Sequence, residues 1–290
     1  MSINKSAVIR LSFPITRELW EIPVLFEDDH LLALNKPAGL LVSADRRDLE
    51  KPNLVKLLHA AIADGLPWVK QRGLSYVMNA HRLDSETSGI LLLAKTKSAL
   101  VYLANLFGTE TPVRRYLGLV RGAPPQEQFE VDAKLAPNTV QLGLMRVDPK
   151  GGKRSRTKFQ VLERFSRWTL VRCEPLTDRT HQIRVHLRYV GCPLVGDRFY
   201  GGKQLLLSRL KTNYRLKPNR EERPLLDRAA LHAELLTLPH PVTGELLTIT
   251  APMPKDLSVA LKYLRRYAPV GGSAPEGSEV VASDDDSPGR

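Results

Sequence analysis

Short apolar, strand-like runs recur along this chain, and they outnumber the segments that repeat with a helical period. The runs do not alternate regularly with helices, as they would in a doubly wound parallel sheet. The fold class predicted is therefore α+β, with a largely antiparallel sheet. The segments predicted to be strands are 22–28, 30–36, 39–44, 89–95, 116–122, 157–165, 168–175 and 245–252.

Three segments carry the features of helices. Asn53 can cap a helix over 54–64, because its side chain can accept a hydrogen bond from the first turn. Residues 97–108 form a second predicted helix, which ends at a glycine. Thr180 is a candidate N-cap for a third helix over 181–190.

The third predicted helix combines an apolar face with basic residues. Ile183, Leu187 and Val190 follow the i, i+4, i+7 spacing and are expected to face the core. Arg184 and Arg188 lie four residues apart on a neighbouring face. Such a face is compatible with a solvated surface as well as with an anionic ligand.

Composition divides the chain into three parts. Residues 1–21 are expected to be a short N-terminal extension. Residues 22–267 are long enough to form one domain with a substantial hydrophobic core. Residues 268–290 are rich in Gly, Ser, Pro and acidic residues, and they are predicted to be a disordered acidic tail because they cannot bury enough apolar surface to offset chain entropy.

The balance of charge narrows the possible partners. Lys and Arg total 43 against 31 Asp and Glu, which gives a net charge of +12. Residues 269–290 carry five acidic residues and one arginine, so the body that precedes them carries +16. A folded body with this excess attracts polyanions, and nucleic acid is the commonest large one. No stretch combines a basic face with an exposed apolar face, so a membrane surface is a poorer candidate.

Cysteine content and hydropathy indicate a cytoplasmic protein. The two cysteines, Cys173 and Cys192, are not at the spacing of metal ligands, and two free thiols are compatible with a reducing compartment. The apolar runs are too short to cross a bilayer. The N-terminus does not contain the apolar core of a secretory signal.

Polar and small residues gather at 79–89, directly before an apolar run. This pattern is typical of a functional loop on a rigid scaffold, but also of a turn in which Asp84 binds backbone amides. Asp84 and Glu86 could form a carboxylate pair for glycoside chemistry. His81, Asp84 and Ser85 could form a nucleophile triad, although such triads are seldom built from neighbours in sequence. The pattern alone leaves these alternatives open.

Several segments resemble the motifs of the RluA-type pseudouridine synthases, in the RsuA/RluA family. HRLDSETSGILLLAKT at 81–96 is similar to the signature of that group, and other segments agree with it in order and spacing. These segments lie at 31–42, 114–122, 179–202 and 231–252, and the resemblance extends over about residues 22–258. It implies the pseudouridine synthase fold, a long mixed and mainly antiparallel sheet flanked by helices, with RNA in a basic cleft.

The same resemblance implies roles for individual residues. Asp84 matches the catalytic nucleophile, Tyr116 the tyrosine that stacks on the target base, and Arg184 the basic residue that pairs with the aspartate. Arg82 matches a residue that enters the space left by the flipped nucleotide. The substrate-binding residues implied by motif positions are Arg82, His81, Thr180, His181 and Ile183.

An enzyme of this kind isomerises uridine in RNA to pseudouridine. It breaks the C1′–N1 bond, turns the uracil and rejoins it through C5, so the nucleotide has to leave its stack. We expect a base-flipping isomerase that acts on a stem-loop of ribosomal RNA or, as second choice, of transfer RNA. The resemblance implies a monomer that requires no metal, no other cofactor and no membrane.

Two features depart from the family pattern. Relatives usually have glycine where this chain has Asp178, so we expect local strain if that position requires positive φ, and competition of Asp178 for Arg179 or Arg184. The family often carries an N-terminal RNA-binding domain of the S4 type. Only about twenty residues precede Ile22, so we expect that domain to be absent and target choice to come from the catalytic domain.

Two other functions fit parts of the pattern. A catalytically inactive RNA-binding or assembly factor could have the same fold, although the joint presence of Asp84, Tyr116 and Arg184 argues against it. A glycoside or nucleoside hydrolase acting on small molecules fits poorly with a body charge of +16 and with a sequence that lacks a nucleoside-hydrolase metal cluster.

Overall fold

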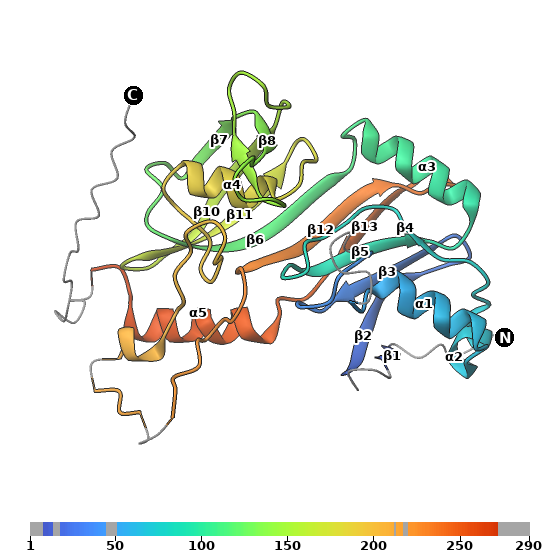
Figure 1. Cartoon of the computed structure of the whole chain (residues 1–290), viewed down its shortest axis with the longest axis horizontal. Coiled ribbons are helices and arrows are strands. Elements are labelled where there is room, and N and C mark those ends of the chain that lie inside the picture. The colour runs from blue at the N-terminus through green and yellow to red at the C-terminus, as the bar shows by residue number, and fades with distance from the viewer. Residues whose placement is uncertain (1–7, 14–17, 45–50, 212, 217–219, 272–290) are drawn as a thin grey trace.

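A computed structural model describes residues 8–13, 18–44, 51–211, 213–216 and 220–271. Its main feature is a long sheet of eleven strands, with β7 at one end and β1 at the other (Figure 1). The strand order is β1-β2-β3-β5-β12-β6-β11-β10-β7, with β13 paired to β12 and β4 paired to β5. Among the described pairs, only β5 with β12 is parallel. The predicted α+β class with a mainly antiparallel sheet is confirmed.

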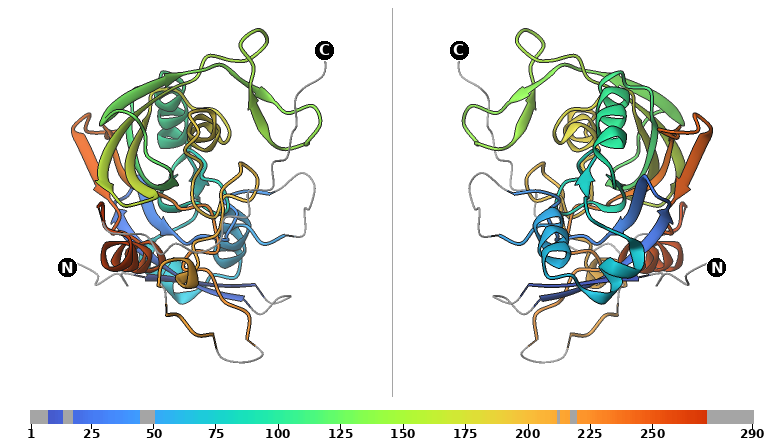
Figure 2. Two further views of the ribbon diagram at one scale, coloured as in Figure 1. Left: turned by 90° about the vertical axis from the view of Figure 1, so that its left-hand side faces the viewer. Right: turned by 90° about the vertical axis from the view of Figure 1, so that its right-hand side faces the viewer.

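The strands of the long sheet are β1 (Val8–Phe13), β2 (Glu18–Glu27), β3 (Leu31–Lys36), β4 (Met78–Asn79), β5 (Ser88–Ala94), β6 (Val113–Arg121), β7 (Gln128–Asp132), β10 (Arg156–Arg164), β11 (Trp168–Pro175), β12 (Leu231–Pro239) and β13 (Leu246–Thr250). A separate hairpin pairs β8 (Leu135–Pro137) with β9 (Met145–Val147), and it lies at the outer edge of the molecule in both views of Figure 2.

The helices are α1 (Leu54–Ala63), α2 (Pro67–Arg72), α3 (Lys97–Gly108), α4 (Gln182–Tyr189) and α5 (Lys255–Tyr267), with a short 3-10 helix at Leu207–Arg209. The predicted first and second helices are confirmed as α1 and α3. Asn53 caps α1 as expected, because its side chain accepts a hydrogen bond from the Lys56 N–H at 2.9 Å. In the described part of the chain, no helix has the length and apolar character needed to span a membrane.

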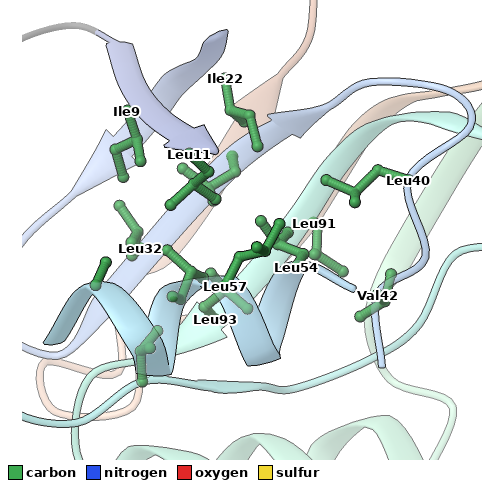
Figure 3. Close-up of a cluster of buried hydrophobic side chains, with 14 of the residues drawn as sticks. Ile9, Leu11, Ile22, Leu32, Leu40, Val42, Leu54, Leu57, Leu91 and Leu93 are labelled. Carbon is green, nitrogen blue, oxygen red and sulfur yellow. The ribbon is translucent and has the colours of Figure 1, made fainter. Parts of the chain in front are cut away.

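Helix α1 covers one face of the sheet at the β3–β5 end. Leu54 and Leu57 of α1 pack with Leu32 of β3 and with Leu91 and Leu93 of β5 (Figure 3). Leu91 and Leu93 are two apart on β5, and Leu32 is the partner of Leu93, so the three side chains share a face. Their alternates point to the opposite face, where they form a second core with α3.

Helix α4 lies on the same face as α1, further along the sheet. Ile183 and Leu187 of α4 pack with Phe159 of β10 and Val171 of β11. Tyr116 of β6 contacts both this core and the core under α1. A pocket lined by residues of β6 and α4 lies at this junction, and α5 covers the opposite face of β6 and β11.

The predicted strand at 39–44 is wrong. Leu41 forms a single bridge to Asn53, and the rest of the segment is irregular. Leu40 and Val42 are nevertheless buried in the core under α1. A short apolar run can be buried without pairing as a strand, and periodicity does not separate the two cases.

The start of the folded region lies ahead of the expected boundary at Ile22. That residue lies inside β2, and β1 pairs with β2 along its whole length. Ile9 and Leu11 of β1 enter the core under α1 (Figure 3). At the other end, residues 272–290 of the expected acidic tail lie outside the described residues, and Ala268 is buried beside α5.

Candidate active site

The loop that carries Asp84 joins β4 to β5, and a buried lysine holds its backbone. Lys36, at the end of β3, donates from Nζ to the carbonyls of Pro37, Leu40 and Ser85 at 2.8, 2.8 and 3.0 Å. Its side chain is fully buried. Burial lowers the pKa of Lys36 to about 7, and the nearby Asp84 carboxylate opposes that decrease.

A second buried cation, Arg228, holds the other half of this loop. It donates to the Glu86 carbonyl at 3.2 Å and to Ser88 Oγ at 3.3 Å. The Asp256 carboxylate accepts hydrogen bonds from Arg228 Nε at 2.7 Å and Nη2 at 3.1 Å. Asp256 lies in the first turn of α5, so this helix is linked to the loop through Arg228.

Gly89 brings the end of the loop against the backbone of β12. Its φ is 109°, and a Cβ atom at this position would lie 2.2 Å from the Ala233 carbonyl oxygen. Gly89 and Ala233 are partners where β5 and β12 pair in parallel. A residue with a side chain cannot make this approach, so the glycine determines the path of the chain just after Asp84.

Arg184 of α4 lies between two carboxylates. Its Nη1 donates to Asp84 Oδ2 at 3.0 Å, while Nε and Nη2 donate to the two oxygens of Asp197 at 2.7 and 2.8 Å. Arg184 and Asp197 are buried, whereas 25% of the Asp84 side chain is exposed. Burial acts to lower the pKa of Arg184, but the hydrogen bonds and charges of Asp197 and Asp84 outweigh it and raise that pKa. The bidentate contact with Asp197 orients a permanent positive charge towards Asp84.

Polar side chains anchor α4 on the sheet. Gln182 donates to Thr157 Oγ1 at 3.0 Å and accepts a hydrogen bond from Thr177 Oγ1 at 2.7 Å. The ring of His186 also bonds to Thr157 Oγ1, at 2.9 Å. Together with those of Arg184, these contacts satisfy the polar side chains of residues 182–187, which are all buried although half of them are polar.

The predicted N-cap of α4 is wrong. The helix begins at Gln182, and its N-cap residue is His181, which makes no capping bond with its side chain. Thr180 is exposed. The Gln182 N–H instead donates to the Arg179 carbonyl at 3.1 Å, so a backbone turn satisfies a donor at the start of the helix.

Asp84, Tyr116 and Arg184 line one pocket, and Arg82, His181 and Ile183 line it with them. Tyr116 enters from β6, and burial raises its pKa to about 12, so the phenol keeps its proton at neutral pH. Arg82 is exposed. The structure thus brings together six of the eight site residues expected from the sequence.

His81 and Thr180 are not among the residues that line this pocket. The Nε2 atom of His81 accepts a hydrogen bond from the Leu92 N–H at 3.0 Å. Its ring stacks on Phe107 of α3, with centroids 5.0 Å apart. His81 therefore supports the loop through the sheet and α3, and Thr180 lies exposed beside the turn that precedes α4.

Asp178 does not produce the strain expected of it. Among the described residues, positive φ outside glycine is confined to Glu110 and His181. The Asp178 carboxylate pairs with Arg114 Nη1 at 3.2 Å. Since Arg184 is bound by Asp84 and Asp197, the expected competition of Asp178 for Arg184 is not seen in the described contacts.

The polar residues around Asp84 bind other groups and do not form a carboxylate pair or a nucleophile triad with it. The Glu86 carboxylate accepts a hydrogen bond from the Ala229 N–H at 3.3 Å, and Glu86 is not among the pocket residues. Ser85 is held through its carbonyl, and the His81 ring bonds to the backbone of β5. Neither an Asp84–Glu86 pair nor a His81–Asp84–Ser85 triad is assembled.

Four supporting residues were not predicted: Lys36, Asp197, Tyr200 and Arg228. Lys36 could have been found, because it follows Leu32 and Leu34 on a buried face of β3. Asp197 and Tyr200 lie inside the matched segment 179–202, but their contacts run back to α4, which no local pattern indicates.

The arrangement supports chemistry at a carboxylate. One oxygen of Asp84 is bound by Arg184, so the other is available to act as a nucleophile or as a base. The ring of Tyr116 offers a flat apolar surface in the same pocket, suited to a planar base. Within the described residues, no group of three or more His, Cys, Asp or Glu is placed to hold a metal ion.

Sequence comparison relates the chain to enzymes that modify RNA. A family model described as RNA pseudouridylate synthase matches residues 30–189. The chain is 39% identical over 244 residues to the ribosomal large subunit pseudouridine synthase C of Escherichia coli (strain K12), an alignment that covers 83% of this chain and 70% of that protein. It is 37% identical to the ribosomal large subunit pseudouridine synthase D of Nitrosomonas europaea, with 88% of this chain and 68% of that protein covered.

Solved structures show the same fold. The human RNA pseudouridylate synthase domain containing 4 superposes with a TM-score of 0.63 and 24% identity, covering 83% of this chain and 92% of that one. The human RNA pseudouridylate synthase domain containing 1 gives a TM-score of 0.59 and 26% identity, covering 82% and 87%. The matched family region, 30–189, contains Asp84, Tyr116 and Arg184.

Proposed function

The chain belongs to the RNA pseudouridylate synthase family, and from that membership we propose that it converts specific uridines of ribosomal RNA to pseudouridine, with Asp84 as the nucleophile. It is an isomerase that acts on RNA. Ribosomal RNA is favoured over transfer RNA because relatives at 37–39% identity are named for the large ribosomal subunit. The observation that carries the site assignment is the contact of Asp84 with Arg184 in a pocket that Tyr116 also lines.

In the proposed reaction, the target nucleotide first leaves its stack and enters the pocket, because a stacked uracil cannot turn. Arg82, exposed on the same loop as Asp84, takes the space that the nucleotide vacates. Tyr116 stacks on the uracil and holds it while it is detached from the ribose.

Asp84 then acts through Oδ1, since Arg184 holds Oδ2. It attacks C1′ or removes a proton from the ribose, and the C1′–N1 electron pair leaves with the uracil. The base turns and C5 bonds to C1′, which releases the Asp84 oxygen from C1′ or is followed by return of the ribose proton from Asp84. The proton at C5 is then lost and N1 gains one. The net change is an isomerisation, which needs no oxidant, reductant or energy source, and the proposal includes no metal or organic cofactor.

The proposed enzyme is described further by its domain, its oligomeric state and its compartment. A single catalytic domain spanning 22–267, together with β1, works as a monomer in the cytoplasm. The net charge of +12 supports an RNA substrate, because phosphate contacts account for much of the affinity of such proteins.

Pseudouridine mapping of total RNA tests this function. Cells with and without the gene are compared, and the deletion strain is complemented with the wild-type gene or with Asp84→Asn. We expect one or a few sites in ribosomal RNA to disappear on deletion and to return only with the wild-type gene. Sites that are unchanged in every RNA, or sites restored by Asp84→Asn, would reject the proposal. Loss confined to transfer RNA would reject the ribosomal assignment.

A further inference from the structure

The backbone of His181 is in the left-handed conformation, which is rare for a residue with a side chain. Its φ is 55°, one of only two positive values outside glycine in the described chain. Left-handed backbone costs a residue with a side chain about 1 kcal/mol or more, and such strain gathers at functional sites. The conformation places a histidine directly before α4, and His181 is one of the residues that line the pocket.

Tyr200 holds the ring of His181. Its hydroxyl oxygen accepts a hydrogen bond from the Met145 N–H of β9 at 2.9 Å, and it lies 2.7 Å from His181 Nδ1. Tyr200 is 3% exposed, and burial raises its pKa, so the hydroxyl is protonated at neutral pH. The Met145 contact uses the oxygen as an acceptor. The single hydroxyl proton therefore has His181 Nδ1 as its acceptor among the described contacts.

This donor pattern favours one tautomer of His181. A neutral imidazole whose Nδ1 accepts a hydrogen bond carries its proton on Nε2. His181 Nε2 lies 3.8 Å from Asp84 Oδ1, the oxygen that Arg184 does not bind. The N–H is thus next to the oxygen that reacts in the proposed function.

We propose that Tyr200 is a positioning residue that fixes the Nε2–H tautomer of His181, and that this N–H is a donor in the catalytic pocket. Its acceptors are the oxygens that carry negative charge there: Asp84 Oδ1 before the reaction, and a carbonyl oxygen of the uracil once the C1′–N1 electron pair has moved onto the base. A fixed donor aimed at developing charge stabilises a transition state more than a ground state. This inference rests on the proposed function and assigns a role in it to two further residues.

The Tyr200 ring has a separate role, which the test has to preserve. The Arg184 guanidinium lies over this ring, 4.9 Å from its centroid, and the His181 ring meets it edge-on at 5.5 Å. Tyr200→Phe keeps both ring contacts and removes only the hydroxyl. Tyr102→Phe is the matched control, because Tyr102 is a partly exposed tyrosine on α3, outside the pocket.

Steady-state kinetics are measured on a ribosomal RNA fragment that contains the uridine identified by mapping. We expect Tyr200→Phe to lower kcat by about tenfold to a hundredfold with little change in KM, because the lost interaction acts in the transition state. Tyr102→Phe should match the wild type. Equal kcat for Tyr200→Phe and Tyr102→Phe would overturn the inference.

Two substitutions of His181 separate donation from a structural role. Glutamine can place an amide N–H near the Nε2 position, whereas asparagine reaches only as far as Nδ1 but tolerates positive φ better. If Nε2–H donation matters, kcat for His181→Gln should exceed that for His181→Asn by about tenfold. If His181 only shapes the turn and binds Tyr200, asparagine should be equal or better, and the inference is then wrong.

These outcomes are separable from failure of the proposed function. Absence of pseudouridine formation by the wild-type enzyme on the mapped fragment would reject the function itself. An active wild type in which both tyrosine variants are equal, or in which asparagine is as good as glutamine, would reject only the role of Tyr200 and His181.

Discussion

At the scale of single residues, His81 supports the catalytic loop from outside the pocket. Its Nε2 accepts the Leu92 N–H, so the ring has to be neutral at that atom to keep the hydrogen bond. Burial lowers the pKa of His81 to about 4; the Asp178 carboxylate opposes this decrease, and the positive charge of Arg114 adds to it. Protonation of this ring would therefore break a bond that joins the loop to β5.

The pH dependence of stability follows from this shift. The unfolded chain binds a proton at His81 near pH 6.5, whereas the folded chain does so near pH 4, so stability is lost as the pH falls between these values. His81 should contribute a slope of up to about 1.4 kcal/mol per pH unit in this window. Urea unfolding of the wild type and of His81→Gln at pH 7, 5.5 and 4.5 measures it. His186 and His232 titrate in both proteins, so the difference between the two slopes isolates His81, and parallel curves would contradict the assignment.

Residue roles could be predicted from sequence only where a motif carried them. Asp84, Tyr116 and Arg184 were expected together and line one pocket. The burial of Lys36 could be predicted from its place on β3, but the partners of Lys36 and Asp197 could not, because a buried charge can bind groups that lie far away in the sequence. The Ser85 carbonyl that Lys36 binds is 49 residues away, and no periodic pattern contains that contact.

At the scale of elements, prediction succeeded where the sequence pattern matched a regular structure. Helix α1 begins after Asn53, and β11 has the predicted bounds of 168–175. Helix α5 was not predicted, although Leu257, Leu261 and Leu264 follow a helical spacing and are buried. The cap of α4 could not be predicted, because a left-handed histidine is a tertiary effect rather than a local preference.

The approach of β5 to β12 gives a prediction for Gly89. Gly89→Ala should destabilise the fold by about 3–5 kcal/mol, because the new Cβ would overlap the Ala233 backbone and φ would remain strained. Activity should fall as well, since the backbone shift occurs five residues after Asp84. Thermal and urea unfolding give the stability change.

Gly73→Ala is the control for this prediction. Gly73 also has a positive φ, of 62°, but a Cβ atom there would meet nothing within 4 Å. Its cost should be limited to the left-handed conformation, about 1–2 kcal/mol, with activity retained. Equal costs at the two glycines would show that close approach to β12 is not what Gly89 provides.

At the scale of the whole molecule, charge and topology act together. The net charge of +12 attracts the RNA backbone, while the long sheet places the Asp84 loop opposite α4 in one pocket. The attraction was predictable from composition. The pairing of Asp84 with Arg184 was predictable only from the family resemblance, because the two residues lie 100 residues apart and no local pattern joins them.

RNA affinity should therefore depend steeply on salt. Each phosphate contact contributes a slope of about 0.7–0.9 in log Kd against log salt concentration, so several contacts should weaken binding by tenfold or more between about 50 and 200 mM salt. Arg82→Gln, at the pocket, should reduce the slope by up to about one such contact. Arg265→Gln is the control, because Arg265 lies on α5, pairs with Glu163 of β10 and is on the opposite face of the sheet. A flat response in fluorescence anisotropy titrations would count against a basic RNA-binding surface.

The central claim is that Asp84 carries the reaction while other residues bind the RNA. Its most direct test measures pseudouridine formation and RNA affinity for Asp84→Asn under the same conditions. Asparagine keeps the size of the side chain and removes the charge, so turnover should fall at least about a thousandfold while Kd stays close to that of the wild type. Turnover near the parent rate, with RNA still bound, would contradict the account.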